Sequence, residues 1–84
     1  AGTGTALVAA VVAAVAAFGA RRLWLVTTND NLDALRFYQR RGFRLVEVRA
    51  GAVDRSRATI KPTIPEIGEH DIPIRDEIEL EMKL

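Results

Sequence analysis

The sequence contains no cysteine and only one histidine among its 84 residues. The absence of cysteine excludes disulfide bonds, a cysteine-based zinc site and a cysteine nucleophile, and it favours a reducing, cytoplasmic location. The single histidine, His70, lies in a segment that contains all three prolines. A histidine in such a segment is more often an exposed surface residue than a catalytic base. We therefore predict no metal site and assign His70 no role in catalysis.

Charge is absent from the first twenty residues, AGTGTALVAAVVAAVAAFGA. A stretch of about 20 apolar residues is long enough to cross a bilayer. This one is rich in alanine, which contributes little to membrane insertion, and glycine and threonine dilute its start. No basic stretch precedes the apolar run, as a secretory signal would require. We therefore expect neither a membrane span nor a targeting signal.

The same stretch has the features of a helix in a water-soluble protein, because alanine is the best helix former. Its larger apolar residues recur at three- and four-residue steps, as the buried stripe of a helix does; they are Leu7, Val8, Val11, Val12, Val15 and Phe18. Gly19 is placed to cap the C-terminal end. The pattern predicts a buried, alanine-rich helix over residues 5–18.

Net charge is small, +1 at pH 7, but it is unevenly distributed. Residues 21–61 carry ten Arg or Lys against four Asp or Glu, a local net charge of +6. Residues 62–84 carry two against seven, a local net charge of −5. A basic centre is suited to phosphate groups, although a solvated surface has the same composition, and the acidic end argues against a nucleic-acid partner. A chain of this length forms one small domain at most.

Three segments have the sequence pattern of β-strands. RLWLVTT, at residues 22–28, is an apolar run typical of a strand covered on both faces, as in parallel sheets, and FRLVEVR, at residues 43–49, follows as a second strand. Apolar and charged residues alternate in DEIELEMKL, at residues 76–84, which indicates a half-exposed antiparallel strand. Residues 50–76 show no helical period and predict a long loop, either a cover for an acceptor site or a tether. Three aromatic residues are predicted to lie in the core: Phe18, Trp24 and Phe43.

A short helix is predicted within TNDNLDALRFYQRRGF, residues 28–43. Asp30 or Asn31 can cap its N-terminus. Gly42 fits the left-handed position after its last turn, and Phe43 can close the hydrophobic contact beyond it. The order of elements is therefore helix, strand, helix, strand, long loop and strand, which predicts an α/β fold.

Two glycines, Gly2 and Gly4, stand immediately before the first predicted helix. Glycine lets a backbone approach a ligand closely, and the unpaired amides of a first turn attract anions, so residues 2–5 are suited to a pyrophosphate. Alternatively, the two glycines only make the start of the helix flexible. The Walker phosphate-binding pattern lacks its Lys and Ser/Thr here. The dinucleotide-binding pattern has Leu7 where it needs Gly or Ala, although Asp30 stands near the place of its ribose-binding acid, so a truncated dinucleotide-binding unit is an alternative.

Two stretches together resemble the GNAT acyltransferase superfamily. NLDALRFYQRRGF resembles its N-x-x-A-x-x-x-Y-x-x-x-G-F signature, whose residues are here Asn31, Ala34, Tyr38, Gly42 and Phe43. AGTGTAL resembles the last part of its acetyl-CoA motif, Arg/Gln-x-x-Gly-x-Gly/Ala. Gly2 and Gly4 align with the two glycine positions of that motif. The two stretches are in the superfamily's order, and one helix and one strand separate them, as expected.

The resemblance implies a GNAT-type α/β fold over residues 1–84, as the C-terminal half of a single domain. Two packed helices would lie on a mixed sheet, with the last strand inserted antiparallel between the two earlier ones. The superfamily's first four strands, its first two helices and the Arg/Gln of its motif have no counterpart in this sequence. We therefore expect the chain to self-associate or to need a separate N-terminal half.

The resemblance also implies binding of acetyl-CoA and transfer of its acetyl group to a primary amine, which the sequence does not identify. Asn31 matches the residue that hydrogen-bonds the pantetheine arm, and its alternative role is a plain N-cap. Tyr38 matches the general acid that protonates the departing CoA thiolate, and its alternative role is packing in the core. No base is assigned. The residues implied to bind the pyrophosphate through backbone N–H groups are Gly2, Thr3, Gly4 and Thr5.

Two further functions are compatible with the same residues. One is a non-catalytic fragment or subunit that needs a partner N-terminal half. The other is the dinucleotide-binding fragment. The order of the two resembling stretches favours the acetyltransferase, because two motifs at the expected spacing are more specific than either of them alone.

Overall fold

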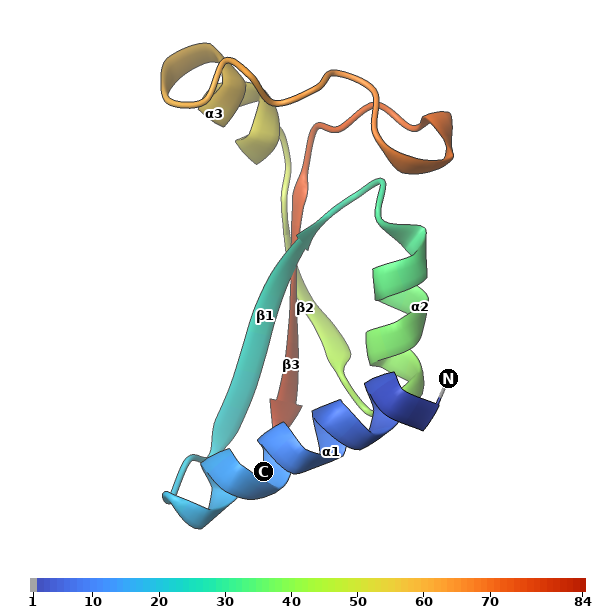
Figure 1. Ribbon diagram of the computed structural model, residues 1–84. Coiled ribbons are helices and arrows are strands. Elements are labelled where there is room, and N and C mark those ends of the chain that lie inside the picture. Colours follow the sequence, from blue (N-terminus) through green and yellow to red (C-terminus); the bar gives the residue numbers. More distant parts are fainter. Residues whose placement is uncertain (1) are drawn as a thin grey trace.

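The computed structural model describes residues 2–84 and combines three α-helices with a three-stranded sheet (Figure 1). In chain order the elements are α1 (Gly2–Ala17), β1 (Arg22–Thr28), α2 (Leu32–Arg40), β2 (Arg44–Arg49), α3 (Ala52–Thr59), a 3-10 turn (Glu69–Asp71) and β3 (Glu77–Lys83). The predicted order of elements is confirmed, except that α3 lies in the segment predicted as a loop. None of the helices in this part of the chain is long and apolar enough to cross a membrane.

The last strand, β3, lies at the centre of the sheet between β1 and β2. It pairs antiparallel with both neighbours, and Leu80 stands opposite Leu25 of β1 and Leu45 of β2. The predicted antiparallel insertion of this strand is therefore confirmed. Within residues 2–84, β1 is an edge strand, and helices lie on only one of the two faces that its apolar sequence predicted to be covered.

The two longer helices, α1 and α2, lie on one face of the sheet (Figure 1). Residues of both helices and of β1 line a common hollow. Leu80 is fully buried at the centre of this face, and Phe43 is buried beside it, as predicted. The expectation of a buried α1 is wrong, since Leu7 and Phe18 are 65% and 93% exposed. Because α1 is apolar on all sides but meets the sheet on only one, much of its apolar surface has no cover within the described residues.

The opposite face of the sheet carries an ion-pair cluster. Glu79 of β3 lies between Arg22 of β1 and Arg49 of β2, each with a guanidinium nitrogen 2.5 Å from its carboxylate. The hydrogen bond from Arg49, together with that from Arg22, holds the pKa of Glu79 below its ordinary value. Trp24 lies in β1 opposite Glu81 and is 55% exposed, so its predicted core position is wrong for the described part of the chain.

Glycine ends both of the longer helices, as predicted. Gly19 has a φ of 85° and Gly42 a φ of 99°, in the left-handed region that glycine adopts without a steric penalty. After α2, the N–H of Gly42 donates to the carbonyl of Gln39, and the N–H of Phe43 donates to that of Tyr38. These bonds satisfy carbonyl groups that the end of a helix leaves unpaired. They also turn Phe43 back against Tyr38, with ring centroids 5.4 Å apart.

The segment of residues 50–76 is more ordered than predicted, because it contains α3. This helix begins after Gly51, which has a φ of 72°, and Val53 is its buried residue. The guanidinium of Arg57 donates hydrogen bonds to three backbone carbonyl oxygens, those of Ile64, Pro65 and Ile74. Periodicity did not reveal α3, because one buried apolar residue makes no periodic pattern and polar contacts hold the segment in place.

Asp30 ties this segment to the turn between β1 and α2. Its carboxylate is buried and accepts hydrogen bonds from the Thr28 hydroxyl and from the Glu69 N–H. Burial alone would raise the pKa of Asp30, but the hydrogen bonds outweigh it and the pKa lies below its ordinary value. The carboxylate is thus engaged inside the fold and does not face solvent, as the ribose-binding acid of the dinucleotide alternative would have to.

Replacing Gly68 with alanine is expected to lower the free energy of unfolding by about 1–3 kcal/mol, the usual cost of overpacking. A Cβ at this position would lie 2.1 Å from Oδ2 of Asp30 and 2.6 Å from Cγ1 of Ile74. Urea unfolding measures the loss. Gly19→Ala is the control, because a Cβ there meets no atom within 4 Å and only the left-handed backbone is strained. A Gly68→Ala variant as stable as the wild type would contradict this packing.

Candidate cofactor site

The first turn of α1 is formed by residues 2–5. The helix begins at Gly2 and not at the predicted residue 5, so the two glycines lie within it and not ahead of it. This turn contains no acidic residue, and the N–H groups of the first three residues of a helix, here Gly2, Thr3 and Gly4, have no partner within the helix. Together with the helix dipole, these N–H groups make the turn suited to an anion. The backbone of all four residues predicted to bind pyrophosphate is therefore gathered in one place.

Gly4 lies against α2. A Cβ on Gly4 would be 3.1 Å from Cε1 of Phe37, closer than a side chain normally approaches a ring. A glycine therefore lets the start of α1 pass next to α2 without displacing Phe37. The position has a packing role in addition to the predicted role toward a ligand.

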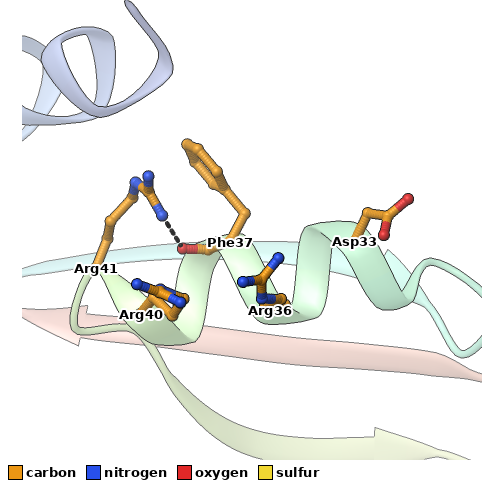
Figure 2. A pocket seen from close by; sticks show the side chains of 5 residues that line it. All are labelled: Asp33, Arg36, Phe37, Arg40 and Arg41. Carbon is orange, nitrogen blue, oxygen red and sulfur yellow. Dashed lines mark hydrogen bonds between the residues drawn. The ribbon is translucent and has the colours of Figure 1, made fainter. Parts of the chain in front are cut away.

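Arg41, after the last turn of α2, is bound to the first turn of α1. Its guanidinium donates to Oγ1 of Thr5, with Nη2 at 2.6 Å and Nε at 3.1 Å, and lies 3.7 Å from the ring centroid of Phe37. Nη1 also donates to the carbonyl oxygen of Phe37 at 2.9 Å (Figure 2). A fixed positive charge therefore stands beside the N-terminus of α1. Sequence reasoning missed this contact, because only the tertiary fold brings positions 5 and 41 together.

Tyr38 packs between two rings and also lines a hollow. It makes edge contacts with Phe37 and Phe43, with centroids 5.2 and 5.4 Å away. The hollow has a volume of about 240 Å³ and lies between α1, β1 and α2; its other lining residues are Leu7, Val8, Val11, Leu23, Trp24, Leu25 and Phe43. The ring is therefore packed, as the alternative role of Tyr38 requires, and the role of general acid stays a prediction.

Asn31 is the N-cap of α2, which confirms one of its two predicted roles. Its Oδ1 accepts a hydrogen bond from the N–H of Ala34 at 3.2 Å, as an N-cap side chain does. The contact with a pantetheine arm stays a prediction. Asn31 precedes α2 and Tyr38 lies in its second turn, seven residues further along the chain.

A second hollow, of about 450 Å³, lies along α2 and is called the arginine hollow here; its lining residues are Asp33, Arg36, Phe37, Arg40 and Arg41 (Figure 2). Two of these lining residues, Phe37 and Arg41, also contact the first turn of α1. Sequence reasoning missed the hollow. The available signal was the spacing of Arg36 and Arg40, four residues apart and thus on one face of a helix.

His70 is exposed, as predicted, and its Nε2 lies 3.5 Å from Oδ2 of Asp33. Glu69 stands close enough that one ligand atom from each of the three residues lies within 4.8 Å of the others. All three side chains face solvent, where acidic groups commonly gather without a metal. We assign this group no function.

Comparison with known proteins identifies the family. The model of the acetyltransferase (GNAT) family matches residues 1–43, half of the chain. This chain belongs to that family. The matched region contains the first turn of α1, the whole of α2 and Tyr38. The predicted resemblance is therefore confirmed, and the first turn and α2 belong to the part of the chain that the family model matches.

Similar proteins are about twice as long as this chain. Uncharacterized protein YdhI of Bacillus subtilis (strain 168) is 46% identical over 77 residues, which are 92% of this chain and 48% of YdhI. A GNAT family acetyltransferase from Elizabethkingia anophelis, solved with acetyl-CoA bound, is 30% identical with a TM-score of 0.77 over 99% of this chain and 50% of that one. A Bacillus subtilis acetyltransferase solved in complex with CoA is 26% identical with a TM-score of 0.83, over 99% and 51%. The GNAT-type α/β fold is confirmed, and the chain spans about half the length of these relatives.

Proposed function

We propose that this protein transfers an acetyl group from acetyl-CoA to a primary amine. The observation that carries the proposal is the first turn of α1, which stands beside the guanidinium of Arg41 within the family-matched region. Two structural relatives were solved with acetyl-CoA or CoA, which supports the same ligand here. The backbone N–H groups of residues 2–5 would hold the pyrophosphate, and Asn31 would hydrogen-bond the pantetheine arm.

Acetyl transfer needs a proton donor at the leaving sulfur. The amine's lone pair forms a bond to the carbonyl carbon, the carbon–sulfur bond breaks, and the sulfur leaves as a thiolate. We assign the phenol of Tyr38 to protonate that thiolate, because a phenol hydroxyl carries a proton that it can donate. The apolar hollow beside Tyr38 is the place for the thioester end. The base that deprotonates the amine is not assigned.

The activity requires, in this proposal, more of the domain than these 84 residues. The chain spans about half the length of its relatives, and the sheet face opposite the helices leaves Trp24 and Val26 55% and 40% exposed. Both residues lie in β1, the edge strand. An apolar edge strand pairs readily with another chain or segment. A missing N-terminal half or a second copy would therefore cover β1 and the open face.

An acetyl-transfer assay with a panel of primary amines tests the function in the protein at its full natural length. Release of the CoA thiol that depends on both acetyl-CoA and an amine is the expected result. Absence of transfer to every amine, with binding of a second polypeptide instead, would favour the non-catalytic subunit. Binding of NAD without binding of CoA would favour the dinucleotide fragment.

Residues 1–84 by themselves are expected to self-associate and to show no multiple turnover. The reason is the uncovered apolar surface of α1 and β1, where Phe18 alone is 93% exposed. Light scattering gives the state of association, and the same assay gives turnover. A monomer with many turnovers would contradict the proposal that a further half is required.

A further inference from the structure

We propose that Asn29 and Asp30 are positioning residues for acetyl-CoA, because they fix the turn that orients Asn31 toward the pantetheine arm. Both residues lie between β1 and α2, and they anchor this turn to the distant segment of residues 66–76. The inference rests on the proposed function, since it needs Asn31 to hydrogen-bond the arm. It adds two residues that act on the ligand only through Asn31.

Asn31 closes a tight turn and begins α2. Its N–H donates to the carbonyl oxygen of Thr28 at 3.1 Å, which leaves Asn29 and Asp30 as the two central residues of a four-residue turn. Its Oδ1 caps α2 by accepting from the N–H of Ala34. Because the cap uses Oδ1, a contact with the arm falls to the two N–H donors of Nδ2, which fit a carbonyl oxygen of pantetheine.

The side chain of Asn29 fastens the turn to the residues that lead into β3. Its Oδ1 accepts from the N–H groups of Arg75 and Asp76, at 2.9 and 3.0 Å, and its Nδ2 donates to the carbonyl oxygen of Pro73 at 2.9 Å. The N–H of Asn29 also donates to the carbonyl oxygen of Asp76 at 3.1 Å. This position therefore uses both the donor and the acceptor of an amide side chain.

The side chain of Asp30 fastens the same turn to a short hairpin, residues 67–73, which is bridged between Ile67 and Pro73. The residue is 4% exposed; Oδ1 accepts from the Thr28 hydroxyl, and Oδ2 accepts from the N–H of Glu69 at 2.9 Å. A buried carboxylate is tolerated only when its oxygens are hydrogen-bonded. The turn is therefore held in the one conformation that satisfies Asp30.

These anchors exceed what the start of α2 requires, since Asn31 by itself supplies the cap. A turn held through both of its central side chains keeps Asn31 in one orientation before a ligand arrives. Ordering a loose turn during binding would cost free energy and weaken the complex. The anchors thus let residues 66–76 contribute to the affinity for acetyl-CoA from outside the first turn of α1 and the hollow beside Tyr38.

A double-mutant cycle measured by isothermal titration calorimetry of the full-length protein with CoA tests the inference. Asn31→Ser keeps a good N-cap and removes the amide. Asp30→Asn keeps the shape of the side chain but turns N–H donors toward the Glu69 N–H or the Thr28 hydroxyl. Each change is expected to raise the Kd of CoA about fivefold, the usual effect of losing one hydrogen bond. The double variant should bind CoA as Asn31→Ser does, because Asp30 acts through Asn31.

Two further variants extend the cycle. Asn29→Asp replaces the donor to Pro73 with an acceptor and should behave as Asp30→Asn does. If Asp30→Asn does not fold, Thr28→Val takes its place, because it removes only the hydroxyl that donates to Asp30. Steady-state kinetics gives a second readout. The loss should appear in the KM of acetyl-CoA, since Tyr38, and not Asn31, is proposed to act on the leaving sulfur.

Arg57→Gln is the matched control, because it removes hydrogen bonds to three backbone carbonyl oxygens of residues 64–74 without touching the turn. It should lower the melting temperature and keep the wild-type affinity for CoA. An equal loss of affinity in Arg57→Gln would overturn the inference, since Asp30 would then act only on the stability of the segment. Additive losses in the double variant, or an unchanged Kd in Asn31→Ser, would also overturn it and leave the proposed function intact. If the wild type binds no CoA, the proposed function fails as well.

Discussion

Tyr38→Phe is expected to lower kcat roughly a hundredfold and to leave the Kd of acetyl-CoA nearly unchanged, within the usual range for loss of a general acid. The substitution removes only the hydroxyl that would donate a proton to the thiolate. The ring keeps its edge contacts with Phe37 and Phe43, so packing around α2 is preserved. Steady-state kinetics of thiol release with the full-length protein gives kcat, and calorimetry gives Kd.

Phe43→Leu is the companion variant, because it disturbs the packing of Tyr38 without removing its hydroxyl. Phe43 is 3% exposed, so this change should lower the melting temperature clearly while costing much less kcat than Tyr38→Phe. An unaltered kcat in Tyr38→Phe would assign Tyr38 to packing alone. A large loss of kcat in both variants would show that the position of α2, and not the phenol, limits the rate.

Gly4→Asp is expected to weaken CoA binding at least about a hundredfold, because opposing like charges at a binding site cost several kcal/mol. The change puts a carboxylate on the first turn of α1, where the pyrophosphate is proposed to lie. It also removes the affinity of this turn for an anion, since the new carboxylate occupies the field of the helix N-terminus. Calorimetry with CoA measures the effect in the full-length protein.

Packing and charge at this position are separated by two further variants. Gly4→Ala adds only the Cβ, which would lie 3.1 Å from Cε1 of Phe37, and Gly4→Asn adds a neutral side chain of the same shape as aspartate. Both should keep much more affinity than Gly4→Asp, and the difference between Asn and Asp reports the charge alone. Equal CoA affinity in the wild type and in Gly4→Asp would show that the pyrophosphate does not bind at this turn.

Features that depend on neighbouring residues were predictable from the sequence. The two glycine C-caps, at Gly19 and Gly42, follow from the conformational freedom of one residue after a helix, and Asn31 was among the two N-caps considered. The alternation predicted a strand at β3, and the family resemblance implied its place between the two earlier strands. The family resemblance has the same origin, because its signature over residues 31–43 lies within one helix and its C-cap.

Burial was less predictable, because it depends on what covers a residue. Phe18 and Trp24 are of residue types that usually lie in a protein core, but they are 93% and 55% exposed. Glu79 is of a type that usually lies on the surface, but it is 8% exposed. Two arginines from the flanking strands cover Glu79, whereas no described element covers the other two. An apolar residue is more stable when other residues bury it, but the sequence alone does not show whether the fold places such residues around it.

The candidate site divides in the same way. The sequence by itself determined its residue types: glycines at the start of one helix, an asparagine before another and a tyrosine seven residues further along. Only the tertiary structure decided that Arg41 contacts Thr5, that Phe37 lies against Gly4, and that Arg36 and Arg40 line a hollow together with Phe37 and Arg41. The physical reason is that these contacts join residues from two separate helices, and their packing on one face of a shared sheet sets the distance between them.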